Sequence, residues 1–217
     1  KFAGIDLQFR EDIFLFKFIR KAEFFYSMIV AIDGPAGSGK SSTAKEVARR
    51  LGFMYLDTGA MYRAVTLKCL RESIDVTDTE ALERMLQKTN LSFEGTPPDM
   101  TVRVDGEDVT RAIRSDEVTK NVSDYCTPQV VRTAMVELQR RIGRNADIVC
   151  EGRDIGTVVF PGAEVKFFMI ASVEERARRR QKDFAALGVE KSIEELIDEI
   201  ELRDKKDSSR QLSPRRP

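Results

Sequence analysis

The chain has 217 residues, of which 41% are hydrophobic and 33% are charged, and this composition is typical of one mid-sized globular domain. Its 36 basic residues balance 36 acidic ones, so no general affinity for nucleic acid is expected. The absence of histidine excludes serine–histidine and cysteine–histidine catalysis, histidine-ligated zinc and a histidine general base.

Two further patterns concern the cellular location of the protein. No run approaches 18 apolar residues, so a membrane-spanning helix is not expected. The three cysteines lie far apart, without a C-x-x-C pair, and we interpret them as small apolar residues in a reducing compartment. We therefore expect a cytoplasmic protein.

The first 27 residues differ from the rest, because they hold seven of the 13 phenylalanines and show no clean period. We expect residues 1–27 to be an extension without a catalytic role, with Met28 as the natural start. The alternative is an amphipathic segment that lies on a membrane surface, since Arg20 and Lys21 stand beside aromatic residues.

The next part of the chain alternates strands and helices. Residues 29–33 form a short apolar run, which indicates a buried parallel strand. A helix follows, with apolar residues over 44–51 at helical spacing. A second strand over 53–56 and a helix over 61–70 come next. This order predicts a parallel sheet with right-handed crossovers.

The middle of the chain changes character, and we expect an inserted lobe over about 75–125. Short apolar runs near 91–93 and 101–104, separated by turn residues, predict antiparallel strands within it. The alternation then returns. It predicts a helix over 131–142, strands over 147–150 and 165–170, a basic helix from 173, and a last helix opened by a capping box of Ser192 and Glu195.

The loop after the first strand carries a phosphate-binding motif. It matches G-x-x-x-x-G-K-[ST] in full, and it lies between a strand and a helix as the motif requires. Its glycines let backbone N–H groups turn inward around an anion, while Lys40 reaches the outer phosphates and Ser41 offers a hydroxyl to Mg²⁺. The motif predicts a nucleoside triphosphate site. Its binding residues are Gly34, Pro35, Ala36, Gly37, Ser38, Gly39, Lys40, Ser41 and Ser42.

Arginines follow the later strands. Arg63 follows the predicted strand over 53–56, and Arg153 and Asp154 follow the predicted strand over 147–150. The carboxyl ends of such strands form the edge where open α/β sheets bind ligands. Residues 203–210 form another basic cluster. Arginines that converge on one mouth suit a second phosphate-bearing substrate. The alternative is that each is a solvated surface charge. No N/T-K-x-D motif is present, so a GTPase is not indicated.

With these motifs in place, the chain resembles the bacterial cytidylate kinases. The resemblance rests on residues 32–42, 57–63, 106–109, 152–161, 171–180 and 203–210. It implies an α/β fold: a P-loop parallel sheet flanked by helices, with a small inserted α+β lobe for the monophosphate and a helical lid over about 174–192. The family domain would span 28–217, and relatives continue past it with a further strand and helix.

The resemblance also implies the reaction, which is transfer of the γ-phosphoryl group of ATP to CMP or dCMP. It implies Lys40, Arg153, Arg176 and Arg180 as catalytic residues. It further implies binding of the acceptor phosphate by Arg63, Arg153 and Arg210, of cytosine by Ser123, Arg132 and Asp154, and of the ribose by Arg203 and Asp207. Thr58 and Tyr62 would line the monophosphate site.

The chemistry of the base supports a cytosine reader. Cytosine presents an amino donor beside two acceptors, which suits a carboxylate and a guanidinium. Uracil would leave buried polar groups unpaired. We expect a monomer with ATP and Mg²⁺ as cofactors, and neither nucleic acid nor a membrane as partner. Two alternatives stay open: another small-molecule P-loop kinase, or an inactive nucleotide-binding fragment.

Overall fold

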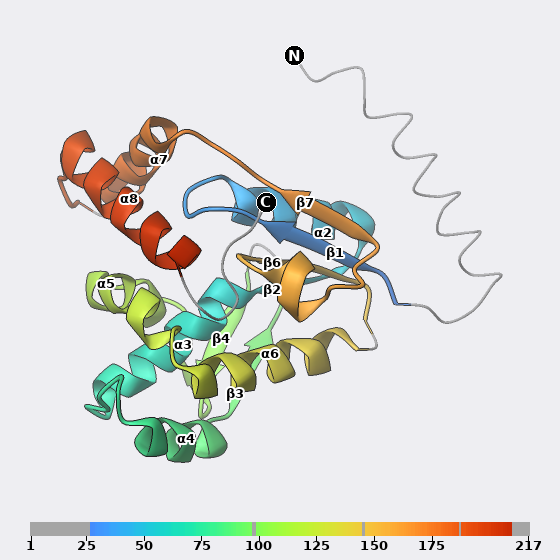
Figure 1. The fold of residues 1–217 in the computed structure, drawn as a ribbon. Helices are drawn as coiled ribbons and strands as arrows, with labels where there is room; N and C mark the ends of the chain where they lie inside the picture. Colours follow the sequence, from blue (N-terminus) through green and yellow to red (C-terminus); the bar gives the residue numbers. More distant parts are fainter. Residues whose placement is uncertain (1–26, 97–98, 145, 187, 210–217) are drawn as a thin grey trace, which may run out of the picture.

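The structure, a computed structural model, describes residues 27–96, 99–144, 146–186 and 188–209 (Figure 1). The expectations for residues 1–26, for Arg210 and for the end of the chain fall outside these ranges. Within the described ranges, no helix combines the length and the apolar character that crossing a bilayer requires.

Four parallel strands form the central sheet in the order β2-β6-β1-β7. The inner strands β1 and β6 pair in register from Ile29 opposite Ile148 to Asp33 opposite Gly152. Every residue of β6 is buried, as expected for a parallel strand covered on both faces. The predicted parallel sheet is therefore confirmed. Its strands are β1 (Ile29–Asp33), β2 (Met54–Asp57), β6 (Ile148–Gly152) and β7 (Val165–Phe168).

Helices cover both faces of this sheet, because successive side chains of a strand point to opposite sides. On one face, Val30 and Ile32 pack in a cluster with Ala44 and Ala48 of α2 (Lys40–Leu51). On the other face, Ala31 belongs to the larger cluster formed with α3 (Thr58–Arg71) and α6 (Gln129–Gly143). Figure 1 shows α2 and α6 on opposite sides of the sheet.

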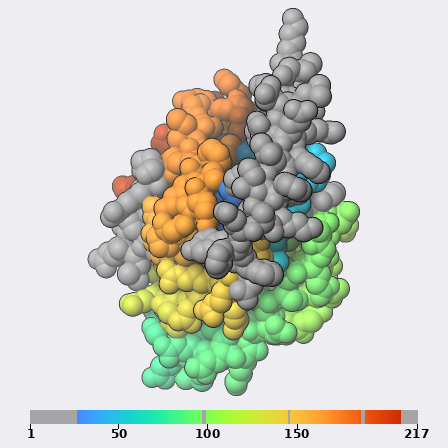
Figure 2. Space-filling model, turned by 90° about the vertical axis from the view of Figure 1, so that its right-hand side faces the viewer, coloured from blue at the N-terminus to red at the C-terminus, as the bar shows by residue number. Residues whose placement is uncertain are grey.

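The segment between α3 and α6 builds a second, smaller sheet. Its strands are antiparallel in the order β3-β4-β5, and Val102 and Val104 are buried against Ala60 and Ala64 of α3. In Figure 2 most of this segment (green) lies below the orange atoms of β7 and α7. Its elements are α4 (Thr79–Lys88), β3 (Leu91–Glu94), β4 (Thr101–Val104), β5 (Glu107–Asp108), η1 (Ala112–Arg114) and α5 (Asp116–Tyr125).

The last two helices, α7 (Val173–Ala186) and α8 (Ile193–Ser209), pack side by side through buried Ala177, Leu196 and Ile200. The predicted capping box is confirmed: the Glu195 amide donates to Ser192 Oγ at 3.1 Å, and the Ser192 amide donates to Glu195 Oε2 at 3.1 Å.

Several elements were not predicted from the pattern, namely α4, β5, η1, α5 and η2. The last of these, η2 (Ile155–Val159), is a single π-helical turn that follows β6 directly, where the sequence shows only apolar residues with Gly156 and Thr157. The predicted strand over 165–170 is also shorter than expected and ends at Phe168.

Replacing Leu82 with alanine tests how firmly α4 is packed. Leu82 is completely buried, so the Leu82→Ala variant should lose about 2–5 kcal/mol of unfolding free energy through lost contacts and a cavity. Urea denaturation measures this loss. The matched control is Leu202→Ala, because Leu202 is 59% exposed and its truncation should change stability by less than about 0.5 kcal/mol. Equal losses in the two variants would contradict this packing.

Candidate functional site

The phosphate-binding loop and the arginine-bearing segments meet at one pocket. The loop leaves the end of β1, and the carboxyl ends of β2 and β6 lie in the same sheet. Side chains from the loop, α3, the turn after β6 and α8 line the pocket together. The structure thus brings together most of the residues expected at the two substrate sites. Among the pocket-lining residues are Lys40, Ser41, Thr58, Tyr62, Arg63, Arg132, Arg153, Asp154, Arg203 and Asp207.

The loop has the backbone shape that an anion nest needs. Gly34, Gly37 and Gly39 have φ values of 147°, 75° and 97°, which side chains rarely allow. A Cβ atom on Gly34 would lie 2.2 Å from the Met169 carbonyl oxygen, so only glycine fits there. Gly39 stands at the N-cap of α2, and the positive end of that helix faces the loop.

Lys40 is folded back onto this loop. Its Nζ donates to the Pro35 carbonyl at 2.7 Å and the side chain is buried. Burial, with the charge of Arg153 next, lowers the pKa of Lys40 to about 7. A phosphate in the loop would favour the charged amine, so the loop and its lysine are suited to an anionic ligand.

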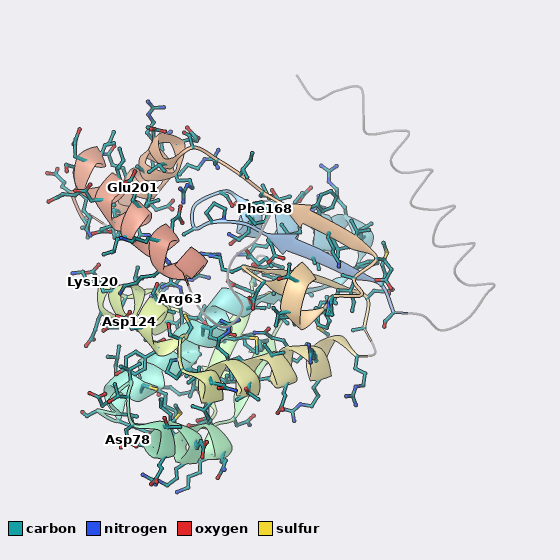
Figure 3. All side chains as sticks on the ribbon, viewed as in Figure 1. Arg63, Asp78, Lys120, Asp124, Phe168 and Glu201 are labelled. Carbon is teal, nitrogen blue, oxygen red and sulfur yellow. The ribbon has the colours of Figure 1, made fainter. Side chains whose placement is uncertain are left out.

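Three arginines crowd the other side of the pocket. Arg63 of α3 donates to Thr119 Oγ1 at 2.8 Å, and Figure 3 shows it where α3, α5 and the end of α8 approach one another. Arg153 Nε lies 3.0 Å from Asp207 Oδ2. Within the described part of the chain, no carboxylate lies at ion-pair distance from Arg203, whose buried Nε has no hydrogen-bond partner.

This crowding disfavours the charged forms of the arginine side chains. Burial first, and neighbouring arginines as well, lower the pKa of Arg203 to about 9 and that of Arg63 to about 10. Partly buried cations that repel one another are stabilised by an anion between them. The electrostatics of the pocket therefore favour a second negatively charged group, in addition to one bound in the loop.

A buried ion pair also lines the pocket. Arg132 of α6 and Asp154, after β6, contact each other and are almost fully buried. The guanidinium of Arg132 also lies over the Tyr62 ring, 5.5 Å from its centroid. Ser123 is buried on α5, but Val122 and Cys126 from the same helix region line the pocket in its place. Arg132 and Asp154 together offer donors and acceptors to a planar polar group.

The basic helix α7 lies against the loop. Arg176 forms an ion pair with Asp204 of α8 at 2.6 Å and donates to the Ala36 carbonyl at 3.4 Å. Arg179, which was not expected in the site, donates to the Gly37 carbonyl at 3.4 Å. Arg180 lies instead 3.7 Å from Glu199 of α8. The structure therefore brings Arg176 and Arg179 to the loop, and Arg180 to α8.

Two carboxylates beside the loop were also missed. Glu151 accepts from Ser41 Oγ at 2.9 Å and from the Tyr55 hydroxyl, and its strand neighbour is Asp57. Burial and the charge of Asp57 raise the pKa of Glu151. Each residue directly follows a predicted strand, which was a signal in the sequence, but the pairing of the two strands was not predicted. Arg114, on η1, also lines the pocket, and its Nη2 lies 3.9 Å from Asp57 Oδ2.

The cations gathered at this pocket predict stabilisation by a simple divalent anion. Sulfate at about ten times its dissociation constant should add about 1.4 kcal/mol, which raises Tm by about 3–6 °C for a chain of this size. Differential scanning fluorimetry with chloride at equal ionic strength measures the specific effect. The Arg203→Met variant should lose most of the shift, while the exposed Arg84→Met control keeps it. An equal shift in both variants would contradict this assignment.

Comparisons with known proteins identify the family of the chain. The family model for cytidylate kinase matches residues 30–217. A cytidylate kinase from Exiguobacterium sp. is 50% identical over 192 residues, covering 88% of this chain and 85% of the relative. Those from Pediococcus pentosaceus and Bacillus subtilis are 49% and 48% identical, covering 85% and 86% of this chain and 82% and 84% of the relatives. The chain belongs to the cytidylate kinase family.

Proposed function

We propose that the protein transfers the γ-phosphoryl group of ATP to CMP or dCMP, giving ADP and CDP or dCDP. The observation that carries this proposal is the shared pocket, in which the loop with Lys40 faces Arg63, Arg153 and Arg203. Two nucleotides held with their phosphates together would neutralise these cations. Membership of the cytidylate kinase family supports the same activity.

ATP would occupy the loop of residues 34–42, with its outer phosphates against Lys40 and the backbone amides. The chemistry of the neighbouring side chains fits Mg²⁺, because the Ser41 hydroxyl and the carboxylates of Glu151 and Asp57 are oxygen ligands at one edge of the pocket. Bound there, the metal ion would neutralise charge on the transferring phosphates. The Tyr55 hydroxyl would hold the Glu151 carboxylate toward Ser41.

The acceptor nucleotide would lie on the opposite side. Its phosphate would meet Arg63 and Arg153, while Arg203 and Asp207 would face the ribose. Arg210, expected beside the phosphate, lies outside the described residues.

Its base would reach the Arg132–Asp154 pair, near Ser123. Asp154 would accept from the cytosine amino group and Arg132 would donate to the ring acceptors. Uracil would set an acceptor against the carboxylate, so discrimination between the two bases is expected.

The reaction requires positioning and charge neutralisation rather than proton transfer. An oxygen of the acceptor phosphate attacks the γ-phosphorus, the new P–O bond forms in line with the breaking bond, and ADP leaves with that electron pair. The attacking oxygen is already ionised near neutral pH, which agrees with a chain that contains no histidine. Lys40 and Arg153 would offset the charge that develops in the transition state.

The segment 174–192 would act as a lid. Arg176 already contacts the loop at the Ala36 carbonyl, and closure would bring its guanidinium to the phosphates and exclude water. Arg180 would join it from the same helix. We further propose that the domain spans 28–217 with an inserted acceptor lobe at about 75–125, and that the protein is a cytoplasmic monomer with neither nucleic acid nor a membrane as partner.

An acceptor panel tests this function against its alternatives. Coupled detection of ADP should show turnover with CMP and dCMP, much slower turnover with UMP, and none with AMP or shikimate. Preference for another acceptor would indicate a different P-loop kinase. ATP binding without turnover on any acceptor would indicate an inactive nucleotide-binding protein.

Replacing Arg176 tests the lid. The Arg176→Ala variant should lower kcat about 100-fold, because the guanidinium would act mainly in the transition state, and should change CMP affinity by less than about threefold. The matched control is Arg178→Ala, since Arg178 is exposed on the same helix. Steady-state kinetics and calorimetric titration with CMP measure the two effects. Equal losses of turnover and CMP binding would contradict the lid.

A further inference from the structure

A buried carboxylate that the proposed mechanism does not use lies between the two halves of the site. Asp33 is the last residue of β1, directly before the phosphate-binding loop, and is only 6% exposed. Its Oδ1 accepts from the Ile155 amide at 2.8 Å and its Oδ2 accepts from the Gly156 amide at 2.8 Å. Asp33 thus holds the start of η2, immediately after Arg153 and Asp154.

These two amides need an acceptor from outside the helix. The first N–H groups of any helix lack partners within it, and an aspartate at the N-cap position commonly supplies one. Asp154 occupies the N-cap position of η2 but makes no capping hydrogen bond through its side chain. Its carboxylate is paired with Arg132 instead, and it lines the acceptor pocket. Asp33 provides the cap that Asp154 does not.

The surroundings fix Asp33 in this place. Its carbonyl oxygen accepts from the Met169 amide at 2.7 Å, which ties the end of β1 to the segment that follows β7. Gly156 packs closely as well, because a Cβ atom there would lie 3.1 Å from Lys166 Cδ and 3.5 Å from Asp33 Oδ2. The backbone of Asp33 is therefore tied to the segment after β7, and the space around Gly156 is tight.

We propose that Asp33 is a positioning residue for base recognition: it caps η2 in place of Asp154 and so leaves the Asp154 carboxylate facing Arg132 and the base. This inference rests on the proposed function, in which Asp154 reads the cytosine amino group. Without Asp33, the Gly156 amide would lose its acceptor and would compete with Arg132 for the Asp154 carboxylate. Selectivity for cytosine would then fall even though no residue that touches the base has changed.

The experiment measures kcat/KM for CMP and for UMP in the wild type, Asp33→Asn and Asp33→Ala. Asn retains one carbonyl oxygen and one capping bond, so the CMP-over-UMP ratio should fall by several-fold in Asp33→Asn and by about tenfold or more in Asp33→Ala. The loss should appear in KM for CMP, while KM for ATP changes by less than about twofold. If Asp33→Ala does not fold, Asp33→Asn carries the test.

The matched control is Asp78→Asn, because Asp78 also caps a helix: it stands at the N-cap of α4 and accepts from the Ala81 amide at 2.9 Å (Figure 3). It should leave the CMP-over-UMP ratio unchanged. The decisive comparison uses the Asp154→Asn variant. If Asp33 acts through Asp154, adding Asp33→Asn to that variant should not change the CMP-over-UMP ratio any further.

The outcomes separate this inference from the proposed function. A wild type that neither binds CMP nor phosphorylates it overturns the proposed function, and the inference with it. A wild type selective for CMP whose ratio is unchanged in Asp33→Asn and Asp33→Ala, while Tm falls, overturns only the positioning role. An equal effect of Asp33→Asn in the wild-type and Asp154→Asn backgrounds overturns it as well.

Discussion

Mutual repulsion among partly buried cations is the constraint on which the site depends. Lys40, Arg63, Arg153 and Arg203 come from separate segments of the chain and line one pocket. Burial and neighbouring arginines lower the pKa values of Arg63 and Arg203. Such an arrangement of charges is suited to a ligand that supplies negative charge. Phosphates are suited to this role, since guanidinium groups bind them through paired hydrogen bonds.

The parallel sheet is what brings these side chains together. All four strands end at the same edge, so residues that follow β1, β2 and β6 become neighbours although they are up to about 120 positions apart in the chain, as between Asp33 and Ile155. Carboxylates complete the arrangement at three points. Asp207 pairs with Arg153, Asp204 pairs with Arg176, and Asp154 pairs with Arg132. These partners hold the guanidinium groups of Arg153, Arg176 and Arg132 in place.

Much of the fold and of the candidate site was predictable from the sequence, whereas contacts between side chains of distant elements were not. The loop and the strand-end arginines follow from a complete motif and from the strand–helix order, because parallel strands bring their carboxyl ends together. The contacts of Glu151 depend on side chains of two other elements, and no spacing reveals them. Whether Arg179 or Arg180 faces the loop depends on how α7 is rotated against its neighbours. The turn η2 depends on a cap that lies 122 residues away in the chain.

A ligand that joins both substrates tests the central claim most directly. We would titrate the protein with an adenosine and a cytidine linked through a chain of five phosphates, using isothermal calorimetry. If donor and acceptor share one pocket, this compound should bind with one-to-one stoichiometry, at least about 100-fold more tightly than ATP or CMP alone, and should exclude both. Binding no tighter than that of ATP, with CMP still able to bind beside it, would contradict the account.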